Sequence, residues 1–336
     1  NPTWPPATQQ EMDSFWDLPF TKQPHPRYKG KHIPAFEMIK FSINTHRGCF
    51  GGCNFCTIAA HQGKFIQSRS EASIIKEITA LNALPGFAGN ISDVGAPTAN
   101  MYGMRGKDPE LCAKCRRKSC LFPGPCKNMN RSHERLLKLY KQIAAVKGIR
   151  HAYIGSGIRY DLFLDEKGFV DETSYPYLRE LILEHTSGRL KVAPEHTEDS
   201  VLKLMAKPSF KLFERLRLEF DSIVRSSGRK CELVPYFISG HPGCGMREMQ
   251  RMAYAQRHRK YLLVKAPPAC GKSRAMMFVA LDKLVNQGIK KVIVAVPEKT
   301  IGRSFNNTDL KSHGFFADWY VAPYFNLCDT ANETEK

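Results

Sequence analysis

The sequence of 336 residues contains no long apolar run, since none approaches the roughly 18 apolar residues of a membrane-spanning helix. Its proline-rich beginning also lacks the basic and then apolar pattern of a secretory signal peptide. The eleven cysteines gather mainly in short loops, and without secretory features this favours metal ligation in a reducing compartment over disulfides. We therefore expect a cytoplasmic protein without a membrane partner.

No long run of Lys or Arg accompanies the net charge of +18. Nucleic acid is one partner that such a charge suits, and an ordinary solvated basic surface is the other interpretation. The apolar fraction of 42% supports a buried core, and the length suits two domains. The first residue is Asn1 rather than Met, which favours an internal fragment of a longer protein.

Three cysteines stand together in the segment HRGCFGGCNFC, at positions 46–56. Cys49, Cys53 and Cys56 have the spacing C-x3-C-x2-C, with an aromatic residue directly before the last. Three thiolates can hold three irons of a [4Fe–4S] cube and leave the fourth iron open to a substrate. Zinc is the rival, but structural zinc sites usually have four ligands, and no fourth follows here. The spacing thus predicts a catalytic redox cluster.

Strand-like and helix-like segments alternate along the first 240 residues. Predicted strands cover 41–45, 91–94, 151–154, 190–193 and 232–238, whereas residues 1–34 predict no regular structure. Predicted helices begin after a capping box of Ser68 and Glu71 and also cover 132–147, 176–187 and 209–227. This alternation predicts an α/β fold with a parallel sheet, whose chemistry gathers where the strands end.

The cysteine motif and four later segments resemble the radical S-adenosylmethionine (SAM) superfamily and, within it, the YgiQ-type family. The segments carrying this resemblance are 25–70, 91–108, IGSGIRYDL at 154–162, GRLKVAPEHT at 188–197 and PYFISGHPGC at 235–244. The resemblance covers about the first 245 residues. It implies a partial (β/α) radical SAM barrel at 1–245 with a covering N-terminal segment, truncated after five strands.

By this resemblance, the protein would cleave SAM reductively to a 5′-deoxyadenosyl radical on a substrate that the sequence does not identify. An electron donor of the reductase or flavodoxin type is implied as partner. The positions implied for binding SAM are Phe55 against the adenine, Gly95 and Ala96 at the amino group, and Ser156, Arg159 and Glu195 at ribose and carboxylate. Turn glycines and an ordinary buried ion pair are the structural alternative.

No catalytic residue is assigned from the sequence. Four histidines flank the predicted pocket, and a single histidine is more often a hydrogen-bonded structural residue than a catalyst. These are His46, His61, His196 and His241.

A second group of cysteines, Cys112, Cys115, Cys120 and Cys126, forms an insertion with the spacing C-x2-C-x4-C-x5-C. Lys and Arg residues at 114 and 116–118 surround these thiols and favour thiolates. Four thiolates can close a zinc site or hold an auxiliary Fe–S cluster. A metal-stabilised basic binding protein is therefore a further interpretation of the chain.

The last part of the chain, 246–336, has a different pattern. A predicted strand at 261–264 leads into APPACGKS at 266–273, in which Gly271, Lys272 and Ser273 would bind ATP phosphates and Mg²⁺. The segment resembles the N-terminal edge of a superfamily 2 helicase, without its acidic strand end. An ATP-binding helicase-like module is thus the alternative function. A genuine two-domain protein, a fusion of two partial domains and a join of unrelated frames all remain open.

Overall fold

The computed structural model describes residues 5–165 and 168–258, the strand at 263–265, and positions 276, 279–280, 282–284 and 286–289. The chain divides into two compact units, 1–237 and 238–336. The predicted domain assignment, divided at residue 245, stays a prediction. None of the helices in the described ranges is both long enough and apolar enough to cross a membrane.

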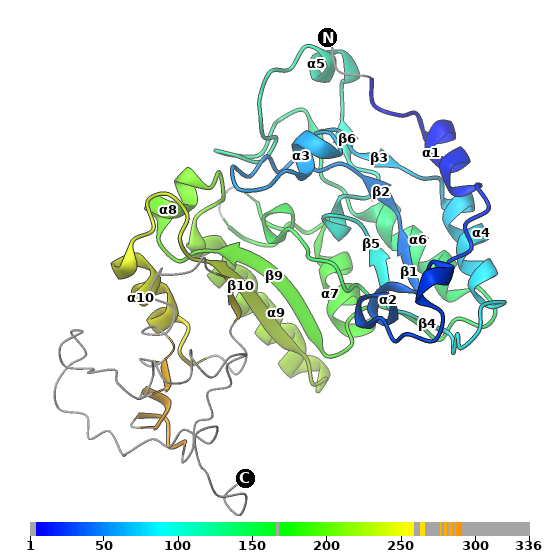
Figure 1. The fold of residues 1–336 in the computed structure, drawn as a ribbon. Coiled ribbons are helices and arrows are strands. Elements are labelled where there is room, and N and C mark those ends of the chain that lie inside the picture. Colours follow the sequence, from blue (N-terminus) through cyan, green and yellow to red (C-terminus); the bar gives the residue numbers. More distant parts are fainter. Residues whose placement is uncertain are drawn as a thin grey trace, which may run out of the picture. The chain divides into compact units, whose positions relative to one another are not determined.

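Parallel strand pairs run through the first unit in chain order (Figure 1). β1 (Ser42–Asn44) pairs with β5 (Asp93–Gly95), and β4 (Asn90–Ile91) pairs with β8 (His151–Ala152). A bridge from Ile158 to Val192 leads to β9 (Arg189–Glu195), which pairs with β10 (Glu232–Ile238). The α/β prediction is confirmed. The predicted truncation after five strands stays a prediction.

Helices connect these strands, as the alternation predicts. The longer ones are α4 (Glu71–Leu81), α6 (Glu134–Ala144), α7 (Tyr175–Glu184) and α9 (Phe210–Ser227). The shorter ones are η2 (Ala99–Met101), η3 (Tyr160–Leu162) and α8 (Asp199–Leu204). Gly228 adopts φ 66° at the end of α9, where glycine meets the left-handed requirement without a steric cost.

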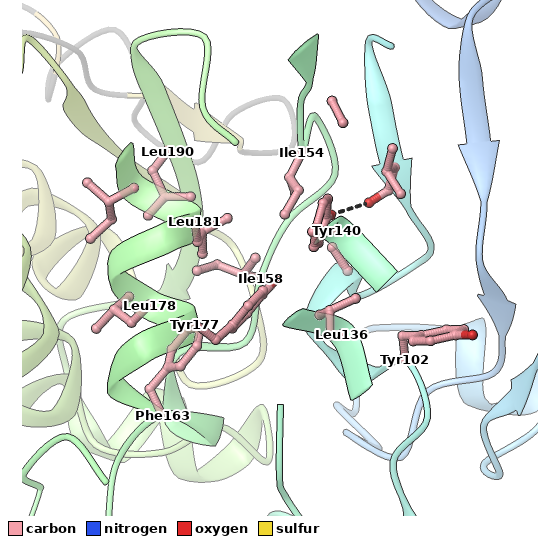
Figure 2. Packing of buried hydrophobic residues seen from close by; sticks show 14 of the residues in the cluster. Tyr102, Leu136, Tyr140, Ile154, Ile158, Phe163, Tyr177, Leu178, Leu181 and Leu190 are labelled. Carbon is pink, nitrogen blue, oxygen red and sulfur yellow. Dashed lines mark hydrogen bonds between the residues drawn. The ribbon is translucent and has the colours of Figure 1, made fainter. Parts of the chain in front are cut away.

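Buried side chains from α6, α7 and the strands form the main core (Figure 2). Leu178 and Leu181 are fully buried on α7, and Leu136 and Tyr140 lie on α6. The Tyr140 hydroxyl donates a 2.9 Å hydrogen bond to the Val94 carbonyl, so its polar atom is satisfied inside the core. Each fully buried leucine contributes about 1.5–3 kcal/mol to stability.

The N-terminal segment is more regular than the sequence predicts. It contains α1 (Gln9–Trp16), η1 (Pro26–Tyr28) and α2 (Pro34–Ile39), so the expectation of no regular structure is wrong. A capping box of Thr8 and Glu11 begins α1. The Asp13 carboxylate accepts a 2.8 Å hydrogen bond from the Ser70 amide and so ties this segment to the start of α4.

The predicted cap of α4 is also wrong. Ser70, not Ser68, is the N-cap, and its side chain accepts from the Ser73 amide at 3.0 Å. Ser68 instead belongs to β3 (Gln67–Ser68), which pairs antiparallel with β2 (His46–Arg47). This non-local strand pairing takes Ser68 away from the helix.

Three more short elements frame the cysteines, and two lie in the second unit. The first three are α3 (Ile58–His61), α5 (Pro109–Ala113) and an antiparallel ribbon of β6 (Arg105–Gly106) with β7 (Met129–Asn130). The second unit has α10 (Met246–Ala255) and β11 (Leu263–Lys265) among its described residues.

Candidate cofactor and metal site

The cluster loop, residues 49–56, follows β2 and lies near the end of β1. The amide of Thr45 donates to the Gly95 carbonyl at 2.9 Å, which joins the ends of β1 and β5. Within the loop, the Cys49 amide donates to the Gly63 carbonyl at 3.1 Å, and the Asn54 amide donates to the Met205 carbonyl at 3.0 Å. Two distant segments thus hold the loop backbone.

Hydrogen-bond donors surround two of the three thiols. The Gly51 amide lies 3.4 Å from the Cys49 sulfur, and the Thr98 hydroxyl lies 3.6 Å from it. The Arg159 guanidinium donates to the Cys53 sulfur at 3.2 Å. A Cβ on Gly51 would lie 2.6 Å from Arg159 Nη1, so only glycine leaves room for this approach. Donors to sulfur suit thiolate ligands of an Fe–S cluster.

Arg159 is itself fixed by a buried ion pair. Its Nε and Nη2 donate to the two carboxylate oxygens of Asp161 at 2.9 and 2.6 Å, and both side chains are less than a tenth exposed. Burial alone would raise the pKa of Asp161, but Arg159 outweighs it and lowers that pKa. Arg159 thus contacts Cys53 and Asp161, and its predicted contact with SAM stays a prediction.

Gly95, the last residue of β5, meets Ser156 in the segment that follows β8. The Ser156 amide and hydroxyl donate to the Asp93 carboxylate at 3.0 and 2.9 Å, and the Gly155 amide donates to it at 2.8 Å. A Cβ on Gly95 would lie only 2.0 Å from the Ser156 hydroxyl. The glycine therefore permits this close strand-end contact. Asp93, absent from the sequence-based site, organises it.

Glu195 ends β9 with φ 73°, a left-handed conformation that is uncommon outside glycine. Such backbone strain clusters at functional sites. The charge of Glu195 also acts on the cluster loop. Burial is the main cause that raises the pKa of Cys56, and Glu195 and the other two thiols of the loop raise it further. Glu195 therefore lies near enough to Cys56 for its charge to act on that thiol.

Lys207 is a buried cation that sequence reasoning missed. It is 5% exposed, and its ammonium donates to the Ala193 carbonyl at 2.7 Å. Burial lowers the pKa of Lys207, and the neighbouring Arg159 lowers it further. No motif marks this lysine in the sequence, because the fold alone brings α8 and the residues after it to the end of β9.

The remaining residues predicted to contact SAM and the histidines near the predicted pocket are described by their burial and local hydrogen bonds. Ala96 is buried and Phe55 is half-buried. His46 is fully buried beside the Thr45 hydroxyl, and burial lowers its pKa to about 3. His196 accepts from the Glu198 amide at 3.0 Å. These histidines fit structural roles, and no catalytic residue emerges from them.

The four-cysteine loop, residues 112–126, packs directly on the cluster loop. The Cys120 amide donates to the Phe50 carbonyl at 3.0 Å, and the Ser119 hydroxyl donates to the Gly51 carbonyl at 2.6 Å. Gly52 adopts φ 60°, and a Cβ there would lie 2.5 Å from the Lys118 carbonyl oxygen. The two loops therefore share a tight backbone interface.

The thiols of the four-cysteine loop have unlike environments. A hydrogen bond from the Arg117 amide lowers the pKa of Cys115, and Lys64 adds to this effect. Burial raises the pKa of Cys120. Among the described residues, no three His, Cys, Asp or Glu side chains already stand close enough to hold a metal ion. In either loop, the cysteine side chains would have to turn toward a shared metal.

The predicted nucleotide-binding residues Gly271, Lys272 and Ser273 lie outside the described residues. The comparisons with known proteins give no support to a P-loop, to ATP binding or to a helicase-like segment.

A family model described as Radical SAM N-terminal matches residues 1–42. A UPF0313 protein from Bacteroides thetaiotaomicron is 54% identical over 255 residues, which are 75% of this chain and 41% of the relative. The UPF0313 protein YgiQ from Escherichia coli is 41% identical over 318 residues, 93% of this chain and 42% of the relative. The chain thus spans about two fifths of the length of these curated relatives.

The Escherichia coli match corrects one expectation. The first 245 of 336 residues are only about 73% of the chain, so a match covering 93% must continue past residue 245. The expected end of the resemblance after Cys244 is therefore too early for this relative.

Among solved structures, the radical SAM methyltransferase TsrM from Kitasatospora setae, with tryptophan and a SAM analogue bound, is 13% identical. The match covers 69% of this chain and 37% of that one with a TM-score of 0.40, and a likeness at this level carries no argument. The family model and the curated relatives together support a YgiQ-type radical SAM family for this chain.

Proposed function

We propose that this chain is the cofactor-binding part of a radical SAM enzyme, with Cys49, Cys53 and Cys56 as ligands of a [4Fe–4S] cluster. The observation that carries this proposal is the 3.2 Å contact of the buried Arg159 guanidinium with the Cys53 sulfur. A cation fixed beside a thiol in a C-x3-C-x2-C loop suits a thiolate ligand. The sequence similarity to YgiQ-type proteins supports the same function.

When bound, such a cluster supplies one electron to SAM and so leads to cleavage of its S–C5′ bond. The chain itself must hold the cluster, orient SAM and exclude water and oxygen. What the protein must supply is therefore geometry and electrostatics. A flavodoxin-type or reductase donor would deliver the electron.

Charge compensation is the first task that the chain's own residues would perform. Three thiolates concentrate negative charge in a small volume, and burial makes such charge costly. Arg159 is held toward Cys53 by Asp161, and the Gly51 amide is directed at Cys49. These donors would stabilise the thiolate forms of Cys53 and Cys49, and Asp161 keeps the guanidinium in place while the cysteine side chains turn toward the cluster.

Orientation of SAM is the second task, and it would fall to the strand ends. Gly95 is a buried residue at the end of β5, close to Ser156, which Asp93 fixes. Glu195 provides a carboxylate at the end of β9. We propose that SAM lies across these two strand ends, with Phe55 against its adenine. Ala96 would add backbone beside Gly95.

A direct test is reductive SAM cleavage by the full chain under anaerobic conditions. After reconstitution with iron and sulfide and reduction with dithionite, we expect 5′-deoxyadenosine from the unaltered chain and none above background from Cys56→Ala. Cys244→Ala is the matched control, because this cysteine lies outside both loops, and it should retain the activity. Equal cleavage by the unaltered chain and Cys56→Ala would overturn the assignment.

A further inference from the structure

We propose that the four-cysteine loop is a second metal site, in which Cys112, Cys115, Cys120 and Cys126 bind a thiophilic metal as thiolates. The metal would be a zinc ion or an auxiliary Fe–S cluster, since both take four cysteine ligands. This site is separate from the cluster loop, and its existence does not depend on SAM cleavage.

Short local contacts give the loop a fixed frame. The ribbon of β6 and β7 closes its base, and the Asp108 side chain caps the start of α5. Inside the loop, the Cys115 amide donates to the Cys112 carbonyl at 3.1 Å, and the Cys126 amide donates to the Cys120 carbonyl at 2.7 Å. These two turns bring the backbone of Cys112 close to that of Cys115, and the backbone of Cys120 close to that of Cys126.

Three of the four thiols line one cavity of about 420 Å³. Cys112, Cys120 and Cys126 share this cavity with Lys64 and with apolar side chains that include Met104 and Met129. Cys115 does not line the cavity, but its sulfur lies 3.7 Å from Nζ of Lys64, which does. All four are free thiols. Space next to several free thiols allows them to turn toward one metal.

The space around Cys112 is also shaped for sulfur. A Cβ on Gly106 would lie 2.2 Å from the Cys112 sulfur, and the Asn128 amide group donates to that sulfur at 3.3 Å. Asn128 is fixed in turn by its 2.8 Å donation to the Asp108 carbonyl. A glycine that makes room for a thiol and an amide donor directed at it are features of a supported metal ligand.

Charge balance fits the same assignment. Four thiolates and a divalent ion leave a net charge of −2, and the loop carries basic residues at 114 and 116–118. Lys64 reaches the loop from outside and donates to the Arg117 carbonyl at 2.6 Å. Nearby cations favour the deprotonated thiols that bind metals.

The contacts with the cluster loop suggest what the metal would do. The loop around Cys120 holds the carbonyls of Phe50 and Gly51, which lie between Cys49 and Cys53. The small apolar cluster beside the four-cysteine loop includes one buried residue of the loop itself, Leu121, so apolar packing does little to order the loop. A bound metal would supply that order. Through the shared backbone interface it would then position the cluster loop.

The test uses the full chain with Cys49, Cys53 and Cys56 all changed to Ser, so that the cluster loop binds no metal. We expect this variant, isolated from medium containing zinc and iron, to retain one zinc ion per chain or a cysteine-bound Fe–S cluster. Elemental analysis distinguishes zinc from iron, and absorption and Mössbauer spectra identify a cluster. Further change of Cys120 and Cys126 to Ser should remove the metal. A variant without either metal would overturn the proposal.

Thiol protection in the unaltered chain gives a second measurement that does not depend on variants folding. Metal-depleted protein is incubated with or without zinc chloride and then alkylated, and each cysteine is followed by mass spectrometry. Zinc should slow alkylation of the four cysteines at least about tenfold, while Cys231 and Cys244 serve as internal controls. Equal rates with and without zinc, in protein that also fails to take up an Fe–S cluster, would overturn the site.

Failure of this inference would look different from failure of the proposed function. Loss of metal from the four-cysteine loop would leave the assignment of the cluster loop standing. Conversely, an inactive cluster loop would not change the metal content of the triple serine variant.

Discussion

The cluster loop and the four-cysteine loop both gather cysteines within fifteen residues, yet their surroundings differ. The cluster loop follows the parallel strands and contacts a buried ion pair, Arg159 with Asp161. The four-cysteine loop instead rests on a short antiparallel ribbon and contacts the partly exposed Lys64. Cysteine spacing alone therefore does not define a site, because the charges and strand ends that surround the thiols depend on the fold.

The two loops should differ most in their effect on SAM cleavage when one cysteine is removed from each. We expect Cys53→Ala to lower the rate of SAM cleavage at least about 100-fold, because two thiolates do not retain the cluster. Cys115→Ala should lower it by less than about tenfold, because that loop acts only through the backbone. Production of 5′-deoxyadenosine measures both. Equal losses in the two variants would erase the proposed distinction.

The second largest difference should lie in how much the charged residue beside each loop contributes to stability. Asp161→Asn leaves the buried Arg159 without its counter-ion, so we expect the free energy of unfolding to fall by about 3–5 kcal/mol. Lys64→Gln is the matched change beneath the four-cysteine loop and should cost below about 1 kcal/mol. Urea denaturation measures both variants. A cost for Asp161→Asn as small as that for Lys64→Gln would show that the buried ion pair does not stabilise the site.

Substitutions at the interface between the loops should cause a smaller change in stability. Gly52→Ala places a Cβ 2.5 Å from the Lys118 carbonyl oxygen at φ 60°, so we expect a loss of about 1–3 kcal/mol. Gly124→Ala lies in the four-cysteine loop with nothing within 4 Å of the new Cβ, and its effect should stay within about 0.5 kcal/mol. Thermal and urea unfolding measure both. Similar values for the two glycines would argue against the tight loop interface.

At neutral pH two buried histidines should have the smallest effect on stability, and their effect grows only as the pH falls. His46 precedes the cluster loop and His133 follows the four-cysteine loop, and burial lowers the pKa of each to about 3. The unfolded chain binds these protons below about pH 6.5, whereas the folded chain does not. Stability should therefore fall as pH drops from 6.5 toward 3, by about 1.4 kcal/mol per pH unit for each histidine.

Single variants show whether the two histidines contribute equally. His46→Asn and His133→Asn should each flatten the dependence of unfolding free energy on pH by about one proton. A slope unchanged in both variants would mean that other groups cause the acid sensitivity.

The sequence predicted the features that depend on local pattern. The alternation of strands and helices gave the parallel order, and the motif placed three cysteines after β1. It placed Glu195 at the end of a strand, and Glu195 is the last residue of β9, whereas Ser156 lies in the segment after β8. Local patterns suffice here because strand-end positions follow from element order once the sheet is parallel.

Features that depend on non-local contacts could not be predicted in the same way. Ser68 has the pattern of a helix cap, but pairing of β3 with β2 assigns that role to Ser70. Lys207 and Asp93 carry no motif, and only folding brings them to the site. By contrast, the Thr8 and Glu11 capping box was visible in the sequence and could have identified α1.

The most direct measurement is the EPR spectrum of the reduced, reconstituted full chain with and without SAM. If three thiolates leave one iron open, SAM binding to that iron should change the g values of the reduced [4Fe–4S] signal. The reduced [4Fe–4S] signal itself should be absent in Cys53→Ala, whereas the signal and its change with SAM should persist in Cys244→Ala. A reduced [4Fe–4S] signal that SAM does not alter would contradict an open iron held by Cys49, Cys53 and Cys56.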